Sequence, residues 1–317
     1  MRLGAGIDLP ALAMRMSSSL WDYNLTGGTL PPVLSVARGS TGTRVNNVGL
    51  IVVEAANTPR FDYEPVTHVC RGLLVEEQAT YFGQYSEQVG TAPWALTNAL
   101  SVTGVAADSP LRAGDTVERL GGGSATGSSA QISGVPTANA LVQHWMVRNV
   151  SAITSQIIYR DTVSSTQVAV TISWASATAG AEITSVTPAA AAGGITCVTA
   201  QKTQFTGGWW LVTAVYTVTA LASAHLLRLQ PSNNPVGGSC DVAASWGTYS
   251  NSPQSYLLTT TMPVTRDADV LNILDTSRAV ELTYVPLSGG SPQTVIIAAG
   301  NQPGALAGIF TRARQLL

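Results

Sequence analysis

The segment GWWLVTAVYTVTA, residues 208–220, is the clearest indication of the fold in this chain. It is rich in β-branched and aromatic residues and follows a TGG turn, which is typical of a β-strand. Adjacent side chains on a strand point to opposite faces of a sheet. We therefore expect one of Trp209 and Trp210 to face a core and the other to face outward.

Segments of the same kind recur along the chain, and glycine-rich turns such as GGGS and SGG separate many of them. They are VGLIVVEA (48–55), ALVQHWMVRN (140–149), SQIIYRD (155–161), TQVAVTISWA (166–175), GITCVTA (194–200), HLLRLQP (225–231), SYLLTTT (255–261) and RAVELTYVPL (278–287). Only residues 10–16, 75–82 and 305–317 have a pattern that a turn or more of helix would fit. The chain is predicted to be all-β, an antiparallel jelly roll or β-sandwich.

Composition shifts divide the chain into three parts. Small polar residues replace the apolar periodicity at 106–134, which predicts a flexible connection or a long surface loop, and a second shift falls at 259–275. We expect a strand-rich N-terminal anchoring segment (1–85), a jelly roll (86–271) and a C-terminal β-hairpin with a tail (272–317). In that hairpin, SGGSP forms the turn.

The low charge of the chain excludes several function classes. Only 11% of the residues are charged, the net charge is −2, and no basic stripe is present, so binding to nucleic acid is not expected. No apolar run is long enough to span a membrane, and the N-terminus is a poor signal peptide, so we expect a soluble chain without membrane insertion. Cys70, Cys197 and Cys240 are expected to be free thiols; a Cys197–Cys240 disulfide would need two adjacent strands.

The stretch NTPRFDYEPVTHVCRGLLVEEQAT, residues 57–80, concentrates charge in this charge-poor chain. Arg60, Phe61, Asp62 and Tyr63 alternate charge with aromatic rings, as on a short strand, and Gly72 permits unusual backbone geometry before an apolar run. Glu76 and Glu77 are adjacent acids, which raises the possibility of a glycosidase pair. Neighbours on a strand point to opposite faces, however, so we do not expect these two carboxylates to converge on a substrate.

Other catalytic and metal-binding patterns are weak. His68, His144 and His225 are isolated in sequence, and no G-x-S-x-G nucleophile elbow accompanies them. The acidic residues lack the spacing of a calcium loop, and GGGSATGS lacks the lysine of a phosphate-binding loop. We expect no enzyme activity, no metal and no cofactor.

The charged stretch and its surroundings resemble segments of bacteriophage and prophage virion proteins of the tail-fibre or structural class. ARGSTGTRVNNVGLI (37–51) followed by NTPRFDYEPVTHVCRGLLVEEQAT fits the family's strand pair and its "NxPRFDYDPvT…RGLLiEeqrTN" segment, departing at Cys70 and at Tyr81-Phe82. WALTNALSVTG (94–104), GGWWLVTAVYT (207–217) and SYLLTTTMPVTRDADVLNI (255–273) resemble the entry, a central strand and the exit of a carbohydrate-binding-module-like jelly roll. The resemblance implies a cofactor-free β domain, often trimeric. It also suggests a structural junction at Arg60, Phe61, Asp62, Tyr63, Gly72, Glu76 and Glu77.

Aromatic residues gather in the predicted jelly roll, where exposed rings would stack on sugars. The candidate ligand residues are Trp145, Trp209, Trp210, Trp246, Tyr249, His144 and Arg148. Burial in a core or subunit contact is the commoner role of such tryptophans.

We expect a virion appendage, assembled in the bacterial cytoplasm, that binds a host surface polysaccharide without turnover. It would contact other virion proteins through its N-terminal segment and form a homotrimer. The alternatives are a purely structural capsid or tail component, and a depolymerase.

Overall fold

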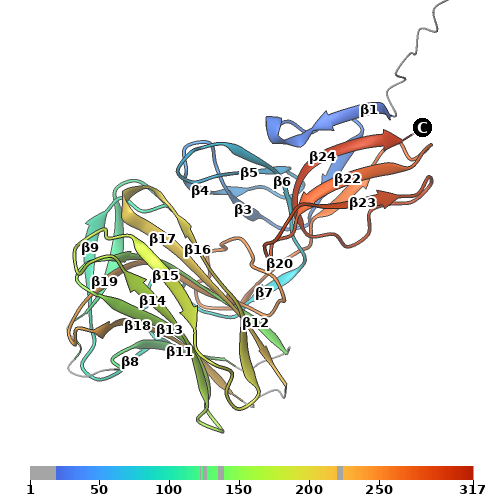
Figure 1. The fold of residues 1–317 in the computed structure, drawn as a ribbon. Coiled ribbons are helices and arrows are strands. Elements are labelled where there is room, and N and C mark those ends of the chain that lie inside the picture. The colour runs from blue at the N-terminus through green and yellow to red at the C-terminus, as the bar shows by residue number, and fades with distance from the viewer. Residues whose placement is uncertain (1–18, 122, 124–126, 135–138, 220–223, 317) are drawn as a thin grey trace, which may run out of the picture.

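The protein forms two lobes of antiparallel strands, and both ends of the described chain lie in the smaller lobe (Figure 1). The computed structural model describes residues 19–316 apart from 122, 124–126, 135–138 and 220–223. Within these residues the helical elements are two short 3-10 turns, η1 (Leu25–Gly27) and η2 (Thr206–Gly208). The all-β prediction is confirmed.

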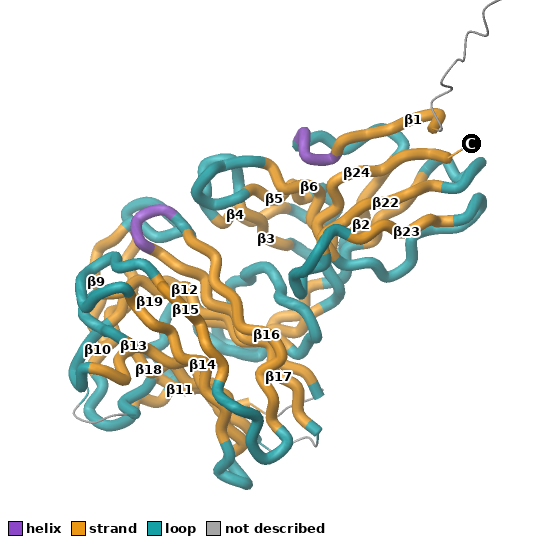
Figure 2. Tube along the Cα trace, viewed as in Figure 1, coloured by secondary structure: helices purple, strands orange, loops and turns teal. Residues whose placement is uncertain are grey.

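The larger lobe is a β-sandwich of two antiparallel sheets (Figure 2). Sheet I has the order β16 (Ile195–Gln204), β17 (Trp209–Val218), β12 (Ala140–Asn149), β19 (Cys240–Thr248), β10 (Asp115–Gly121) and β9 (Ser101–Ala107). Sheet II has the order β15 (Ile183–Pro188), β14 (Gln167–Trp174), β13 (Thr154–Asp161), β18 (His225–Asn234), β11 (Ala130–Gly134) and β8 (Ala95–Leu96). The main core lies between the sheets and joins residues such as Trp145 and Trp210 of sheet I to Ile157 and Leu229 of sheet II.

The two sheets differ in how their outer faces are covered. On β14 burial alternates strictly, because only the face toward sheet I is packed. On β19 every residue is buried, and on β12 all but one are, because sheet I is covered on both faces. Its outer face forms a second core with Tyr256 and Leu257 of the segment before β20 (Val264–Arg266). Sheet I is therefore the central layer of the molecule.

The smaller lobe combines the beginning and the end of the described chain in one sheet. Its order is β23 (Gln293–Ile297), β22 (Val280–Val285), β24 (Gly308–Leu316), β6 (Cys70–Val75) and β5 (Arg60–Tyr63), with β1 (Ser19–Asn24) also paired to β24. The two-stranded antiparallel sheet of β2 (Leu34–Ala37) and β21 (Val270–Ile273) packs on this sheet, and β3 (Gly42–Val45) pairs with β4 (Ile51–Glu54). The predicted C-terminal hairpin is present as β22 and β23. The described strands β1–β6 of the predicted segment 1–85 and β22–β24 of the predicted segment 272–317 therefore share one lobe, whereas β7 pairs with β19 of sheet I.

The chain passes between the lobes twice, and the two passages pair with each other. β7 (Ala79–Tyr81) leads into the sandwich and β20 leads back, with Arg266 opposite Ala79. Thr248 of β19 also pairs with Tyr81, so the crossing strands extend sheet I. Residues that flank the crossing, Glu76 before β7 and Asp269 after β20, consequently lie near one another.

Several local expectations are wrong. Residues 79–81 and 308–316 form strands and not helices. On β24 (Gly308–Leu316), Arg312 and Arg314 lie on the same face and form ion pairs with Asp22 and Glu281. This spacing of two residues is that of a strand. SYLLTTT is not a strand, because other groups bind its backbone: Glu76 accepts the Ser255 N–H, and Ser86 accepts the Thr259 N–H through its hydroxyl. The predicted loop at 106–134 contains the whole of β10 and β11. Residues 10–16 lie outside the described residues.

Candidate functional site

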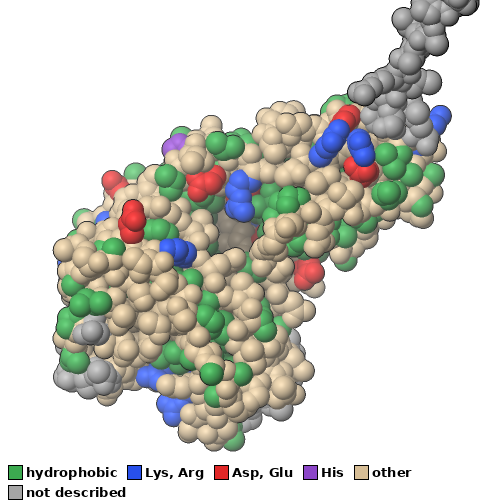
Figure 3. All heavy atoms as spheres, viewed as in Figure 1, with side chains coloured by type: hydrophobic (Ala, Val, Ile, Leu, Met, Phe, Trp, Pro, Cys, Tyr) green, Lys and Arg blue, Asp and Glu red, His purple; other side chains and the backbone are tan. Residues whose placement is uncertain are grey.

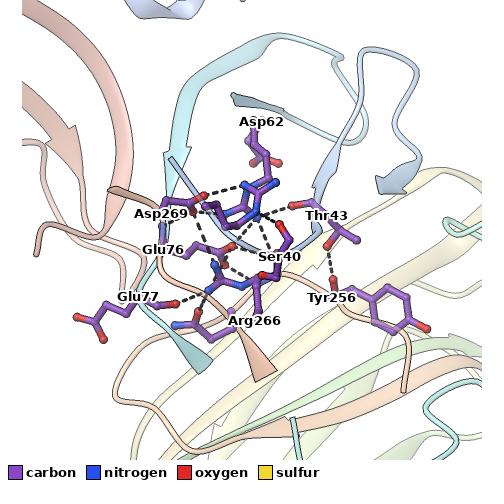
Figure 4. A network of polar contacts seen from close by, with 12 residues as sticks. Ser40, Thr43, Asp62, Glu76, Glu77, Tyr256, Arg266 and Asp269 are labelled. Carbon is purple, nitrogen blue, oxygen red and sulfur yellow. Dashed lines mark hydrogen bonds and ion pairs between the residues drawn. The ribbon is translucent and has the colours of Figure 1, made fainter. Parts of the chain in front are cut away.

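A buried network of charged side chains joins the two lobes where the crossing strands enter the smaller lobe (Figure 4). It contains three arginines, Arg38, Arg60 and Arg266, and two acids, Glu76 and Asp269. All five side chains are at most 1% exposed. This network explains why a charge-poor sequence concentrates charge at residues 57–80 and again at 266–269. We call it the junction network.

Arg60 and Glu76 form the centre of the junction network. Arg60 Nη1 lies 2.6 Å from Glu76 Oε2 and donates to the Thr43 carbonyl at 2.7 Å. Glu76 also accepts hydrogen bonds from the backbone N–H and the hydroxyl of Ser255, at 2.5 and 2.7 Å. Ser255 belongs to the segment that packs on sheet I, so Glu76 ties the smaller lobe directly to the sandwich.

Asp269 connects the remaining arginines. It accepts from Arg38 Nη1 at 2.7 Å and from Arg60 Nη2, and its second oxygen also accepts the Glu76 backbone N–H at 2.8 Å. Arg266 lies 3.7 Å from both acids and donates at 2.7 Å to the Gln254 side-chain oxygen. Buried charges are tolerated only when they are paired and hydrogen-bonded in this way.

The network keeps its members charged. Burial alone would raise the pKa of Glu76, but the guanidinium groups of Arg266 and Arg60 outweigh it and lower that pKa to about 2. Burial likewise opposes the charge on Arg60, and the carboxylates of Glu76 and Asp269 overcome it and raise the Arg60 pKa above its ordinary value. A carboxylate held ionised between arginines is a structural anchor and a poor general acid at neutral pH.

The side chains of Glu76 and Glu77 point in different directions, as predicted for neighbours on a strand. Glu76 points into the junction network, whereas the Glu77 side chain points away and is exposed (Figure 4). Glu77 contributes to the junction through its backbone carbonyl, which accepts a hydrogen bond from Arg266. The two carboxylates therefore do not face one space, and a glycosidase pair at these residues is not formed.

The other predicted junction residues support the network from the side of β5 and β6. Phe61 lies in the core of the smaller lobe, and half-buried Tyr63 packs against that core. Asp62 accepts from the Val45 N–H and from Arg71 Nη1, both at 3.0 Å, and burial raises its pKa. Gly72 has φ of +135° where β6 passes close to β24.

A cavity of about 230 Å³ lies between the lobes beside the junction network. Its lining includes Arg44, Arg71, Gln201, Trp246 and Tyr256. Figure 3 shows a hollow in the surface between the lobes with charged side chains at its border. The indole Nε1 of Trp246 is one of several buried side-chain atoms that have no hydrogen-bond partner among the described residues. The cavity thus combines aromatic rings with polar groups, a composition typical of small-ligand sites.

The described part of the chain has no strip of exposed tryptophans of the kind predicted. Trp209 and Trp210 do point to opposite faces of sheet I, but Trp210 lies in the main core and Trp209 lies in the second core, where its indole N–H donates to the Asp108 carbonyl at 2.8 Å. Trp145 belongs to the main core and Trp246 to the second. The expectation of an outward ring was wrong because the outer face of sheet I is covered, which strand periodicity does not reveal.

The remaining predicted ligand residues are dispersed. Buried His144 stacks on Trp246 with ring centroids 4.7 Å apart, and both residues line the cavity. Arg148 lies over the Trp209 ring at 4.9 Å, and half-buried Tyr249 stacks on Phe82 at 4.5 Å. Only His144 and Trp246 of the predicted set therefore share the interlobe cavity.

Acidification is expected to destabilise the protein through His225, whose two buried ring nitrogens have no hydrogen-bond partner among the described residues. Burial lowers the His225 pKa from 6.5 to about 4. The unfolded chain therefore takes up the proton first, so stability is full above pH 6.5 and falls as the pH drops toward 4. We expect a loss of roughly 3 kcal/mol in unfolding free energy across this window. Urea unfolding at several pH values measures it.

The control for this effect is exposed His68. The H225F variant should lose about half of the pH dependence between 6.5 and 4, while the H68Q variant should keep all of it. Equal pH dependence in wild type and H225F would contradict the assignment to His225. Buried His144 contributes in the same direction and by a similar amount, because burial lowers its pKa from 6.5 to about 3, so H225F is expected to keep the other half of the pH dependence.

No helix among the described residues has the length and hydrophobicity needed to cross a lipid bilayer. No group of three histidine, cysteine or acidic residues there is arranged to hold a metal ion. Cys70, Cys197 and Cys240 are free thiols.

The sequence matches no family model, and no curated protein sequence matches it significantly.

Proposed function

We propose that this chain is a non-catalytic appendage protein of a bacteriophage or prophage particle, of the tail-fibre or spike class, that binds a host surface glycan. The sequence motifs between residues 36 and 271 support the virion class. The junction network supports binding without turnover, because Glu76 is saturated by Arg60, Arg266 and Ser255 and Glu77 faces elsewhere. The protein would be assembled in the host cytoplasm and carried on the particle.

The interlobe cavity is the observation that carries the glycan proposal. It places the aromatic rings of Trp246 and Tyr256 beside the polar groups of Gln201 and Arg71. Sugar rings present apolar faces to aromatic side chains and hydroxyl groups to polar ones. The ligand site is therefore proposed at this cavity and no longer on an exposed tryptophan strip.

Partner subunits and other virion proteins would contact the remaining surface. The smaller lobe, which carries the N-terminal segment, is proposed to face the rest of the particle. A homotrimer is proposed because the chain is poor in charge and leaves apolar side chains such as Val53, Val69 and Leu274 more than half exposed. Light scattering that shows a monomer alone would count against the trimer.

Glycan arrays of host envelope polysaccharides test the binding proposal. We expect the Q201A and R71A variants to weaken binding roughly tenfold, the effect of losing one well-placed hydrogen bond. The matched control is Q88A, because Gln88 is exposed and does not line the cavity. Equal binding by all three variants would remove the cavity from the proposal, and the appearance of new reducing ends would favour a depolymerase.

The second candidate is a purely structural capsid or tail component. The burial of Trp145, Trp209 and Trp210 favours it, because these three rings are buried in the cores and do not line the interlobe cavity. Failure of the wild type to bind any host polysaccharide would support this candidate. Electron microscopy of intact particles, with the chain labelled, would then show whether it occupies the tail or the capsid.

A further inference from the structure

A row of residues crosses one end of the outer face of sheet I. Register places Thr103 of β9 opposite Arg119 of β10, Arg119 opposite Asp241 of β19, and Asp241 opposite Arg148 of β12. Arg148 in turn lies opposite Trp209 of β17. Facing residues on adjacent strands have Cβ atoms about 5 Å apart, so the two arginines flank one carboxylate.

Asp241 holds both guanidinium groups in place. Its side chain is fully buried, and it accepts from Arg119 Nε at 2.7 Å and Nη2 at 3.2 Å. It also accepts from Arg148 Nη2 at 2.7 Å and Nε at 3.3 Å. Arg148 is held further by the Trp209 ring beneath it. Each guanidinium therefore donates to Asp241 through its Nε and Nη2 groups, and the Nη1 groups are directed away from Asp241.

The charges of this row do not cancel. Two arginines share one carboxylate, which leaves a surplus of one positive charge, and the Arg119 and Arg148 side chains remain 38% and 22% exposed. The nearby Asp108 uses its carbonyl to accept from Trp209 and its carboxylate to accept the Gly114 N–H. Arg112 provides a contrast, because it is 52% exposed but pairs with two acids, Glu87 and Asp115.

We propose that Arg119 and Arg148 form a binding site for an oxyanion, either a phosphate or a carboxylate group. Guanidinium groups recognise such anions through paired N–H donors, and a fixed orientation lowers the entropy lost on binding. A host polymer with acidic or phosphorylated residues is one source of this group, and a free anion is another. The site is separate from the interlobe cavity and does not depend on the glycan proposal.

NMR titration of the full chain tests the site by following the arginine Nε–Hε resonances. Inorganic phosphate, glucuronate, neutral glucose and sodium chloride are titrated separately. We expect saturable shifts of Arg119 and Arg148 with phosphate, glucuronate or both, with a dissociation constant on the order of 1 mM, and none with glucose. A response to phosphate alone assigns a phosphate ligand, and a response to glucuronate alone assigns a carboxylate. Shifts that match those produced by sodium chloride would overturn the proposal.

Three variants separate specific binding from general charge. R119Q should weaken anion binding roughly tenfold or more, because one of the two donor groups is lost. R112Q removes the same charge from the neighbouring acid-paired arginine and should leave binding unchanged. R119K keeps the charge without the planar fork, so it should also weaken binding while the chain stays folded by circular dichroism. Equal weakening by R112Q and R119Q, or full binding by R119Q, would contradict the site.

Discussion

The E76Q variant should lose roughly 3–5 kcal/mol of unfolding free energy, the loss typical of removing one partner from a buried ion pair. Glutamine has nearly the same shape as glutamate, so the change removes the charge and little else. Arg60 and Arg266 would then be buried with Asp269 as their remaining acidic partner in the junction network. Urea unfolding followed by fluorescence and circular dichroism gives the difference.

E77Q is the matched control, because the same substitution one residue away changes an exposed side chain. Surface substitutions of this kind usually change stability by less than about 0.5 kcal/mol. Similar losses in the two variants would show that general charge, and not the junction network, accounts for the effect. Wild-type stability in E76Q would contradict the role of Glu76.

The same variant has a pH signature. The Glu76 pKa is lowered from 4.5 to about 2 in the folded protein, so its contribution is present above pH 4.5 and is lost as the pH falls toward 2. This loss amounts to roughly 3 kcal/mol in the wild type. E76Q has no carboxyl group at this position and should not show that part of the acid dependence. The window lies below the one expected for His225.

The G72A variant should be destabilised by roughly 3 kcal/mol or more, because it combines backbone strain with a steric clash. Gly72 has φ of +135°, a conformation that residues with a Cβ rarely adopt. A Cβ at this position would also collide with the carbonyl oxygen of Phe310 on β24. Relief would require β6 and β24 to separate, which opens the core of the smaller lobe. Urea unfolding measures the loss.

Gly290 offers a control with strain but without the clash. It has φ of +109° in the turn between β22 and β23, and a Cβ there would meet no atom within 4 Å. G290A should therefore lose roughly 1–2 kcal/mol, the range for a strained backbone position alone. A loss in G72A no greater than that in G290A would show that the approach of β24 to β6 is not what requires glycine.

The local sequence pattern was sufficient to predict the fold class and many of the strands. ALVQHWMVRN coincides with β12, and the segments around Trp174 and Trp210 are strands as predicted. The alternation of charged and aromatic residues correctly predicted a short strand at Arg60–Tyr63. Such a prediction needs only the local sequence, because successive side chains on a strand point to opposite faces. The separate directions of Glu76 and Glu77 follow from the same rule.

Long-range pairing was not predictable in this way. The pairing of β24 with β6 joins residues more than two hundred positions apart, and nothing in either segment specifies the other. The covering of the outer face of sheet I also depends on long-range contacts, so one of Trp209 and Trp210 was expected to face outward, whereas both are buried. The sequence contains one indication of the junction network. Charged residues occur at 38, 60 and 266–269 in a chain where charged residues are scarce.

Hydrogen exchange measured by mass spectrometry on wild type, E76Q and E77Q tests the junction most directly. If buried charge fastens the smaller lobe to the sandwich, E76Q should exchange faster in β5, β6, β7 and β20, while β13 and β14 within the sandwich keep wild-type protection. E77Q should match the wild type throughout. Unchanged protection of the crossing strands in E76Q would mean that apolar packing alone joins the lobes and that the charges at residues 57–80 have another purpose.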